Sequence, residues 1–226
     1  MKKGKLIVIE GNDGSGKGTQ HKLLLEYLTK NNVSFSAFDF PQYESTFFGN
    51  FVGRFLNGDF GHVSRINPYL AMFPYAGDRW QVKEKLHESV NSGKLVICNR
   101  YAPSIAYQVV KVKPSERKKF LSWAEELEYK VFGIPREDWV IFLYVPFKVA
   151  HKLIEQKGER KYLNGKTHDQ YEDYDYLKRV EKMYLWLSKI KKNWIRIDCC
   201  DHNGQMKTRE EIFSEILKRL KSKKVL

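Results

Sequence analysis

Residues 6–20, with the sequence LIVIEGNDGSGKGTQ, decide the fold of this chain. The apolar run Leu6–Ile9 is typical of a strand, and it leads into a loop in which Gly11 is followed after four residues by Gly16 and Lys17. That spacing indicates a phosphate-binding P-loop, whose backbone N–H groups point at phosphate oxygens at the start of a helix. We expect Lys17 to reach the β- and γ-phosphates of ATP. The predicted ATP-binding residues are Gly11, Asn12, Asp13, Gly14, Ser15, Gly16, Lys17, Gly18 and Thr19.

Short apolar runs alternate with helical segments along the rest of the chain. The strands expected from them are residues 6–10, 35–40, 95–99, 140–145 and 194–198. Between them, apolar residues recur at helical spacing, for example from Phe120 to Val131, and Thr208 with Glu211 forms a capping box before the last helix. Strands that alternate with helices pair in parallel. The sequence therefore predicts an α/β three-layer P-loop fold with a five-stranded parallel sheet flanked by helices.

The length and composition are those of one globular domain. With 226 residues, 42% of them hydrophobic and 30% charged, the chain can bury one full core, so we predict a single domain over residues 1–226. No apolar run approaches the ~20 residues that cross a bilayer, and the start lacks the apolar core of a signal peptide. Cys98, Cys199 and Cys200 have no metal-ligand spacing and are expected to stay reduced. These features predict a cytoplasmic protein with no membrane partner.

The formal net charge of +13 suits either nucleic acid or small phosphorylated substrates. Charge alone does not choose between them, so a P-loop ATPase stimulated by DNA or RNA stays open as an alternative. The polar and basic residues 158–171, GERKYLNGKTHDQY, have no strand or helix pattern and lie between two helical segments. We expect them to form a short mobile lid.

The residue after Lys17 is Gly18, where a P-loop usually has a Ser or Thr whose hydroxyl binds Mg²⁺. The sequence GSGKGTQ at 14–20 resembles the loop of adenylate kinases. The loop by itself therefore leaves the acceptor nucleotide open, and a kinase for another nucleoside monophosphate is a second alternative.

Other segments resemble the thymidylate kinase family over nearly the whole chain. They are IEGNDGSGKGT at 9–19, FPQYEST at 40–46, YAGDRWQ at 75–81, LVICNRYAPSIAYQ at 95–108 and DQYED at 169–173. The resemblance implies a Mg²⁺-dependent transfer of the ATP γ-phosphoryl group to dTMP, which gives dTDP and ADP, a step of nucleotide biosynthesis. It also implies a homodimer whose other partners are small nucleotides, and nucleic acid is not expected to bind.

The same segments indicate which residues hold dTMP. Tyr75 precedes Arg79 by one helical turn, so both side chains project from one face of a helix, and in the family these positions stack on the thymine and hydrogen-bond it. The resemblance places Asp13 at the sugar hydroxyl and Arg100 on the acceptor phosphate. The predicted dTMP contacts are Asp13, Phe40, Tyr43, Tyr75, Arg79, Arg100, Ser104, Gln108 and Tyr171.

Three basic residues are expected to carry the chemistry, namely Lys17, Arg100 and Arg160. Some family members have an arginine in the loop where this chain has Gly14. Phosphoryl transfer needs positive charge around the moving group. We therefore expect this charge to come from the lid, from Arg160 or its neighbour Lys161.

The chain departs from the family pattern beside the predicted metal site. The expected aspartate is Asn99, which offers an oxygen but no charge, and the turn to Ser104 is one residue short. Glu10 and Asn99 both end strands next to the loop. We expect one or both of them to hold Mg²⁺ through water.

Overall fold

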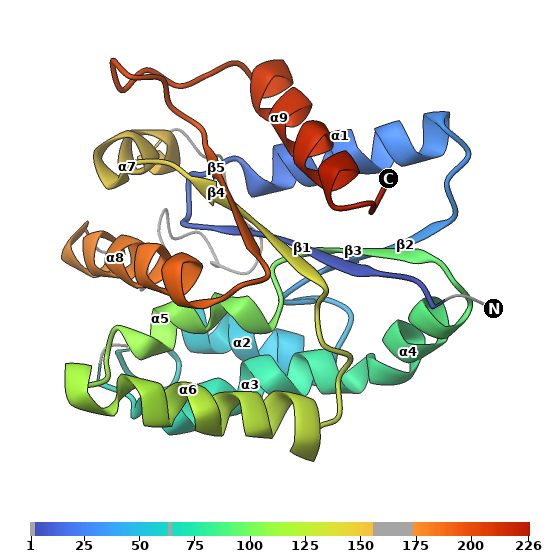
Figure 1. Cartoon of the computed structure of the whole chain (residues 1–226). Coiled ribbons are helices and arrows are strands. Elements are labelled where there is room, and N and C mark those ends of the chain that lie inside the picture. Colours follow the sequence, from blue (N-terminus) through green and yellow to red (C-terminus); the bar gives the residue numbers. More distant parts are fainter. Residues whose placement is uncertain (1–2, 63–64, 156–173) are drawn as a thin grey trace.

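The computed structural model describes residues 3–62, 65–155 and 174–226, and its centre is a parallel sheet (Figure 1). Its strands are β1 (Leu6–Gly11), β2 (Phe35–Asp39), β3 (Leu95–Asn99), β4 (Trp139–Tyr144) and β5 (Trp194–Asp198). They lie in the order β2-β3-β1-β4-β5, and every neighbouring pair is parallel. The predicted α/β class and five-stranded parallel sheet are confirmed, and each strand begins and ends within one residue of its prediction.

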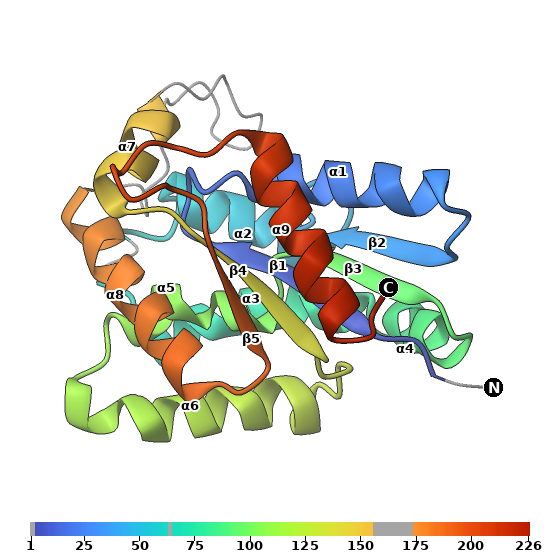
Figure 2. The same ribbon diagram turned by 45° about the horizontal axis from the view of Figure 1, so that its top comes forward.

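Helices cover both faces of the sheet. They are α1 (Lys17–Lys30), α2 (Phe47–Asn57), α3 (Pro68–Gln81), α4 (Lys83–Asn91), α5 (Ala106–Val109), α6 (Arg117–Glu126), α7 (Phe147–Glu155), α8 (Tyr174–Ile190) and α9 (Arg209–Ser222), with shorter turns η1 (Ala102–Ile105), η2 (Pro114–Glu116) and η3 (Leu127–Val131). Figure 2 shows α1 and α9 together on one face, where they share a core. Most of the other helices pack on the opposite face, which completes the three predicted layers.

Side chains along β1 point alternately to the two faces of the sheet, and each face packs against its own group of helices. Ile7 and Ile9 pack with Leu24 of α1, whereas Leu6 and Val8 pack on the opposite face with residues of α4. Buried on both faces, β1 lies in the middle of the sheet and carries the P-loop at its carboxyl end. Ligands of open parallel sheets bind outside the carboxyl ends of the strands, so the fold itself points to this edge as the site.

The prediction that one apolar helix face extends from Phe120 to Val131 is wrong at its end. α6 stops at Glu126, and the chain continues as η3, a π-helical turn with wider spacing that rotates the residues after it. Val131 is 67% exposed, and the acidic Glu128 is buried instead. This turn therefore carries a charged side chain into the interior, where it meets Arg79.

The capping box of α9 is confirmed, because the Thr208 hydroxyl accepts from the Glu211 backbone N–H and the Glu211 carboxylate accepts from that of Thr208. The sequence patterns do not predict α2 or α4. The predicted lid at 158–171 lies outside the described residues. In the part of the chain that the structure describes, no helix has the length and apolar character of a membrane span.

Candidate active site

The P-loop lies between β1 and α1, as its spacing predicts. Gly14 adopts a φ of 79°, and a Cβ built on it would lie 2.3 Å from the carbonyl oxygen of Ala150 on α7. Only glycine fits there, so this position has no room for the arginine of some family members. Lys17 is buried, and its Nζ donates to the carbonyl oxygen of Asn12 at 2.7 Å. The amine therefore lies inside the loop that is expected to wrap the donor phosphates.

Glu10, near the end of β1, is a fully buried carboxylate surrounded by donors. Its Oε1 accepts from the Tyr184 hydroxyl at 2.8 Å and from Arg100 Nη1 at 3.3 Å. Its Oε2 accepts from the Ser104 hydroxyl at 2.7 Å, and the Gly11 backbone N–H adds a bond of 3.0 Å to Oε1. A carboxylate occupied in this way fixes the side chains around it. Glu10 therefore positions Tyr184, Arg100 and Ser104, and its water-mediated contact with Mg²⁺ stays a prediction.

Arg100 follows β3 with a φ of 60°, a left-handed conformation that is uncommon outside glycine. Its Nη2 donates to Asp13 Oδ1 at 2.5 Å, and its guanidinium carbon lies 5.3 Å from the centre of the Tyr107 ring. Burial by itself lowers the pKa of Arg100, but its neighbours, chiefly Tyr107 and Asp13, raise that pKa well above its usual value. The guanidinium therefore stays positively charged.

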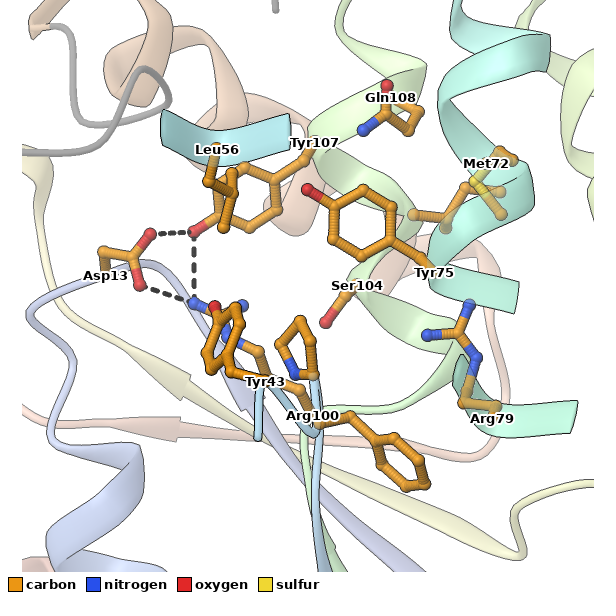
Figure 3. Close-up of a pocket in the computed structure, with 13 residues that line it drawn as sticks. Asp13, Tyr43, Leu56, Met72, Tyr75, Arg79, Arg100, Ser104, Tyr107 and Gln108 are labelled. Carbon is orange, nitrogen blue, oxygen red and sulfur yellow. Dashed lines mark hydrogen bonds and ion pairs between the residues drawn. The ribbon is translucent and has the colours of Figure 1, made fainter. Parts of the chain in front are cut away.

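Asp13 ties the P-loop to the same cluster (Figure 3). Its Oδ2 accepts from the Tyr107 hydroxyl at 2.7 Å, and Lys17 Nζ lies 3.9 Å from its Oδ1. One carboxylate thus connects the donor-phosphate loop to α5, which carries Tyr107. The sequence does not single out Tyr107, because an aromatic residue next to Gln108 gives no sign of a hydroxyl bond to a distant loop.

A cavity opens between the P-loop, the segment after β2, α3 and α5 (Figure 3). It is lined by Asp13, Phe40, Pro41, Tyr43, Leu56, Met72, Tyr75, Arg79, Arg100, Ser104, Ile105, Tyr107 and Gln108. Every predicted dTMP contact within the described residues lines this one cavity. Tyr171, Arg160 and Lys161 lie outside the described residues. The structure thus brings the predicted acceptor residues together, and their individual contacts with a nucleotide stay predictions.

Helix α3 presents Tyr75 and Arg79 to the cavity. The Tyr75 ring packs edge-on against Phe55 of α2, with ring centres 6.2 Å apart. Arg79 forms a buried two-point ion pair with Glu128 of η3, in which Nε lies 3.1 Å from Oε2 and Nη2 contacts Oε1. Burial lowers the pKa of Arg79, but Glu128, Tyr101 and Asp78 together raise it above its usual value. Arg79 is therefore a charged donor in a fixed orientation.

Asp78 of α3 fastens the segment after β2 to the cavity wall. Its Oδ2 accepts from the Gln42 backbone N–H at 2.9 Å, and its Oδ1 accepts from the Thr46 hydroxyl. Thr46 in turn caps α2 by accepting from the Gly49 N–H at 2.8 Å. Burial raises the pKa of Asp78. These bonds hold the aromatic residues of 40–46 at the cavity, and the sequence alone does not predict Asp78 as their anchor.

The neighbouring ends of β2 and β3 carry a polar pair. Asp39 faces Asn99 in the sheet register, and Asn99 Nδ2 donates to Asp39 Oδ1 at 2.9 Å. Asn99 Oδ1 is buried and has no hydrogen-bond partner among the described residues. His21 of α1 contributes a buried Nε2 that likewise lacks a partner within that part of the chain. Neither Asp39 nor His21 is predicted as a site residue from the sequence.

Similarity to known proteins agrees with this geometry. The family model described as thymidylate kinase matches residues 9–212. The thymidylate kinase of Schizosaccharomyces pombe is 32% identical over 161 residues, which cover 71% of this chain and 70% of the relative. The thymidylate kinase of Plasmodium falciparum is 30% identical over 226 residues, which cover 99% of this chain and 93% of the relative. A solved thymidylate kinase from Candida albicans has a TM-score of 0.76 at 21% identity, covers 99% of this chain and 93% of its own, and shows the same fold. By its sequence over nearly its full length, the chain belongs to the thymidylate kinase family.

Proposed function

We propose that this chain transfers the γ-phosphoryl group of ATP to dTMP, which gives ADP and dTDP. Family membership makes it a phosphotransferase, a nucleoside monophosphate kinase with ATP as its donor. The observation that carries the acceptor is the cavity beside the P-loop, around which Tyr75, Arg79 and Arg100 converge. We further propose that residues 1–226 act as one catalytic domain, with residues 158–171 as the lid.

The donor side rests on the P-loop and the start of α1. Backbone N–H groups at a helix N-terminus favour phosphate, and the positive end of the helix adds to this effect. Lys17 begins α1 and directs its amine into the loop, where it would bind the β- and γ-phosphates. The donor nucleotide would therefore lie with its terminal phosphate near Asp13 and Arg100, which border the acceptor cavity.

On the acceptor side, Arg100 is the proposed phosphate clamp. Its side chain is 16% exposed, and its hydrogen bond to the Tyr107 hydroxyl is long, at 3.4 Å. A phosphate oxygen is a stronger partner for a guanidinium than a phenol oxygen, so binding of dTMP would replace this contact. Asp13, which already accepts a hydrogen bond from Tyr107, would also accept one from the sugar 3′-hydroxyl.

The base would occupy the apolar part of the cavity, where Leu56, Met72 and Ile105 contribute to the lining. Tyr75 offers the ring on which a flat base stacks. Arg79 is oriented by Glu128, so its remaining N–H groups are directed donors for a carbonyl oxygen of thymine. Stacking supplies affinity, and the fixed donor supplies selectivity.

Mg²⁺, which the family implies, would neutralise charge on the donor phosphates during transfer. No group of three His, Cys, Asp or Glu side chains within the described residues could hold an ion by itself. That suits Mg²⁺, which keeps several waters and is bound mainly through phosphates. Asn99, whose Oδ1 has no hydrogen-bond partner among the described residues, is the proposed contact to the ion through water. Arg160 or Lys161 would supply the cation at the transition state.

Steady-state kinetics with dTMP, AMP, dGMP and dCMP test the acceptor. We expect the highest kcat/KM with dTMP. An equal or higher kcat/KM with another monophosphate would instead indicate a kinase whose acceptor range is broader or whose acceptor is a different nucleoside monophosphate. ATP hydrolysis that DNA or RNA stimulates, with binding that weakens steeply as salt rises, would support the nucleic-acid-dependent ATPase instead.

An exposed apolar stripe supports a homodimer. Leu70, Phe73 and Trp80 follow helical spacing on α3 and are 65%, 43% and 41% exposed. Exposed apolar patches on soluble proteins often mark interfaces, and we place a second copy of this chain here. Light scattering is expected to give a dimer mass for the natural chain and a monomer mass for Leu70→Glu. A natural chain that stays monomeric contradicts the proposal.

A further inference from the structure

Two positions that commonly bind the metal in P-loop enzymes are neutral in this chain. Such enzymes hold Mg²⁺ with a Ser or Thr of the loop and with an aspartate at the end of a neighbouring strand. Here Gly18 follows Lys17, and Asn99 ends β3, the strand that pairs with β1. A neutral amide can accept a hydrogen bond from a metal-bound water but cannot offset the charge of the ion.

The end of the next strand supplies a carboxylate instead. Asp39 is the last residue of β2 and lies directly opposite Asn99 in the sheet register. Asn99 Nδ2 donates to Asp39 Oδ1, so the amide nitrogen is committed to Asp39. The amide oxygen is bonded to the same carbon as that nitrogen and therefore points away from it, and this buried oxygen has no partner in the described residues. The pair combines a negative charge with an available acceptor.

The other carboxylates at this edge are already engaged. Glu10 receives hydrogen bonds from Tyr184, Ser104 and Arg100, and none of its surface is exposed. Asp13 is held by Arg100 and by the hydroxyl of Tyr107. Asp39 differs, because Asn99 is its one hydrogen-bond donor among the described residues and the residue is exposed, although burial of part of its carboxyl group raises its pKa. Such a carboxylate can bind the water shell of a cation.

The charges around Asp39 belong to residues that are predicted to hold phosphate groups. Its carboxylate interacts electrostatically with Lys17, the lysine of the P-loop, and with Arg100. It also interacts with His21, which follows Lys17 by one turn of α1 and lies on the same side of the helix. Asp39 is therefore within electrostatic reach of the groups that would hold the γ-phosphate.

We propose that Asp39 is the carboxylate that retains the divalent cation of the donor nucleotide, through metal-bound water and with the Asn99 amide as its partner. The family pattern has an aspartate at the end of β3, where this chain has Asn99. In this chain Asp39, at the end of β2, would supply that negative charge. This inference rests on the proposed use of Mg²⁺ with ATP, but it does not depend on which monophosphate is the acceptor.

The test measures metal-dependent nucleotide binding, not turnover. A non-hydrolysable ATP analogue is titrated by calorimetry into the full chain with Mg²⁺ and with EDTA, and Mn²⁺ in the complex is followed by electron paramagnetic resonance. Loss of an outer-shell partner typically costs ~10–100-fold in metal affinity, and we expect a loss of that size in Asp39→Asn. Affinity in EDTA is expected to stay unchanged. Asp59→Asn, which removes an exposed carboxylate paired with Arg54, is the matched control.

A second variant moves the charge back to the neighbouring strand. In the double variant Asp39→Asn with Asn99→Asp, we expect the metal dependence to return, because the carboxylate is again at the same pair of strand ends. Natural metal dependence in Asp39→Asn overturns the proposal, and so does an equal loss of affinity in EDTA. A natural chain that binds the metal nucleotide as expected but does not phosphorylate dTMP would contradict the proposed acceptor alone.

Discussion

The two arginines of the cavity are held in opposite ways. Arg100 divides its guanidinium between Glu10 at 3.3 Å, Asp13 at 2.5 Å and Tyr107 at 3.4 Å. Arg79 makes a buried two-point pair with the single carboxylate of Glu128. A shared arginine can exchange its longest contact for a phosphate oxygen, whereas a two-point pair keeps its geometry with or without a ligand. The two geometries support the proposed roles, in which Arg100 binds the acceptor phosphate and Arg79 hydrogen-bonds the base.

Replacing the shared arginine should have the largest effect on catalysis. In Arg100→Ala we expect kcat/KM for dTMP to fall by ~10³, about 4 kcal/mol, because the acceptor phosphate loses its charged donor. The affinity for an ATP analogue should change little. Arg100→Lys keeps the charge but not the forked geometry, so its kcat/KM should lie between those of Arg100→Ala and the natural chain.

Normal kcat/KM for dTMP in Arg100→Ala would falsify the clamp role. A fall in kcat/KM that is matched by loss of ATP-analogue binding would place Arg100 on the donor side instead. Because the variant also removes the arginine that pairs with Glu10 and with Asp13, thermal unfolding must show that the measured protein is folded.

Breaking the two-point pair should chiefly affect stability. Glu128→Ala leaves the charge of Arg79 buried without a partner, so the free energy of unfolding should fall by about 3–5 kcal/mol. Denaturant unfolding measures this change. Replacing both partners by apolar residues, Arg79→Met with Glu128→Leu, should recover much of the loss while dTMP binding stays weak.

The same turn provides a control for this effect. Val131 lies three residues after Glu128 in η3 but is exposed, so Val131→Ala should change the free energy of unfolding by no more than about 0.5 kcal/mol. If Glu128→Ala were as mild as Val131→Ala, the ion pair would not be what holds Arg79 in place.

The smallest effect is expected at the weakest contact of the shared arginine. Tyr107→Phe removes the hydroxyl that donates to Asp13, which should cost about 1 kcal/mol in dTMP binding and appear in KM more than in kcat. Tyr101→Phe is the matched control, since its buried hydroxyl donates to the Pro135 carbonyl away from the cavity lining. A raised KM in both variants would point to general loosening of the fold.

The sheet could be predicted because its signals are local, whereas most of the cavity residues are predicted from the resemblance to the thymidylate kinase family. The strand-to-loop junction at Gly11 and Lys17 has a fixed spacing, and each buried strand is a short apolar run. Tyr75 and Arg79 share a helix, so their common face follows from one turn of spacing. The P-loop, the strands and the shared helix face of Tyr75 and Arg79 can therefore be predicted before any long-range contact is known.

What escaped prediction depends on contacts between distant segments. Glu128 is buried because a π-helical turn changes the face of the chain, and it meets Arg79 across 49 positions of sequence. Asp39 reaches Asn99 only through the pairing of β2 with β3. An acidic residue in a helix or at the end of a strand gives no local sign of such a partner, so Glu128 and Asp39 look like surface charges until the fold is known.

The contact between Gly14 and the Ala150 carbonyl has an evolutionary consequence. A mutation at position 14 to any other residue would meet the backbone of α7 at a distance that no rotamer relieves, since the obstacle is the Cβ itself. An ancestor or descendant that moved a catalytic cation into this loop would need α7 to shift first. The path between the two arrangements therefore requires coupled changes, and single-site variation should preserve glycine here.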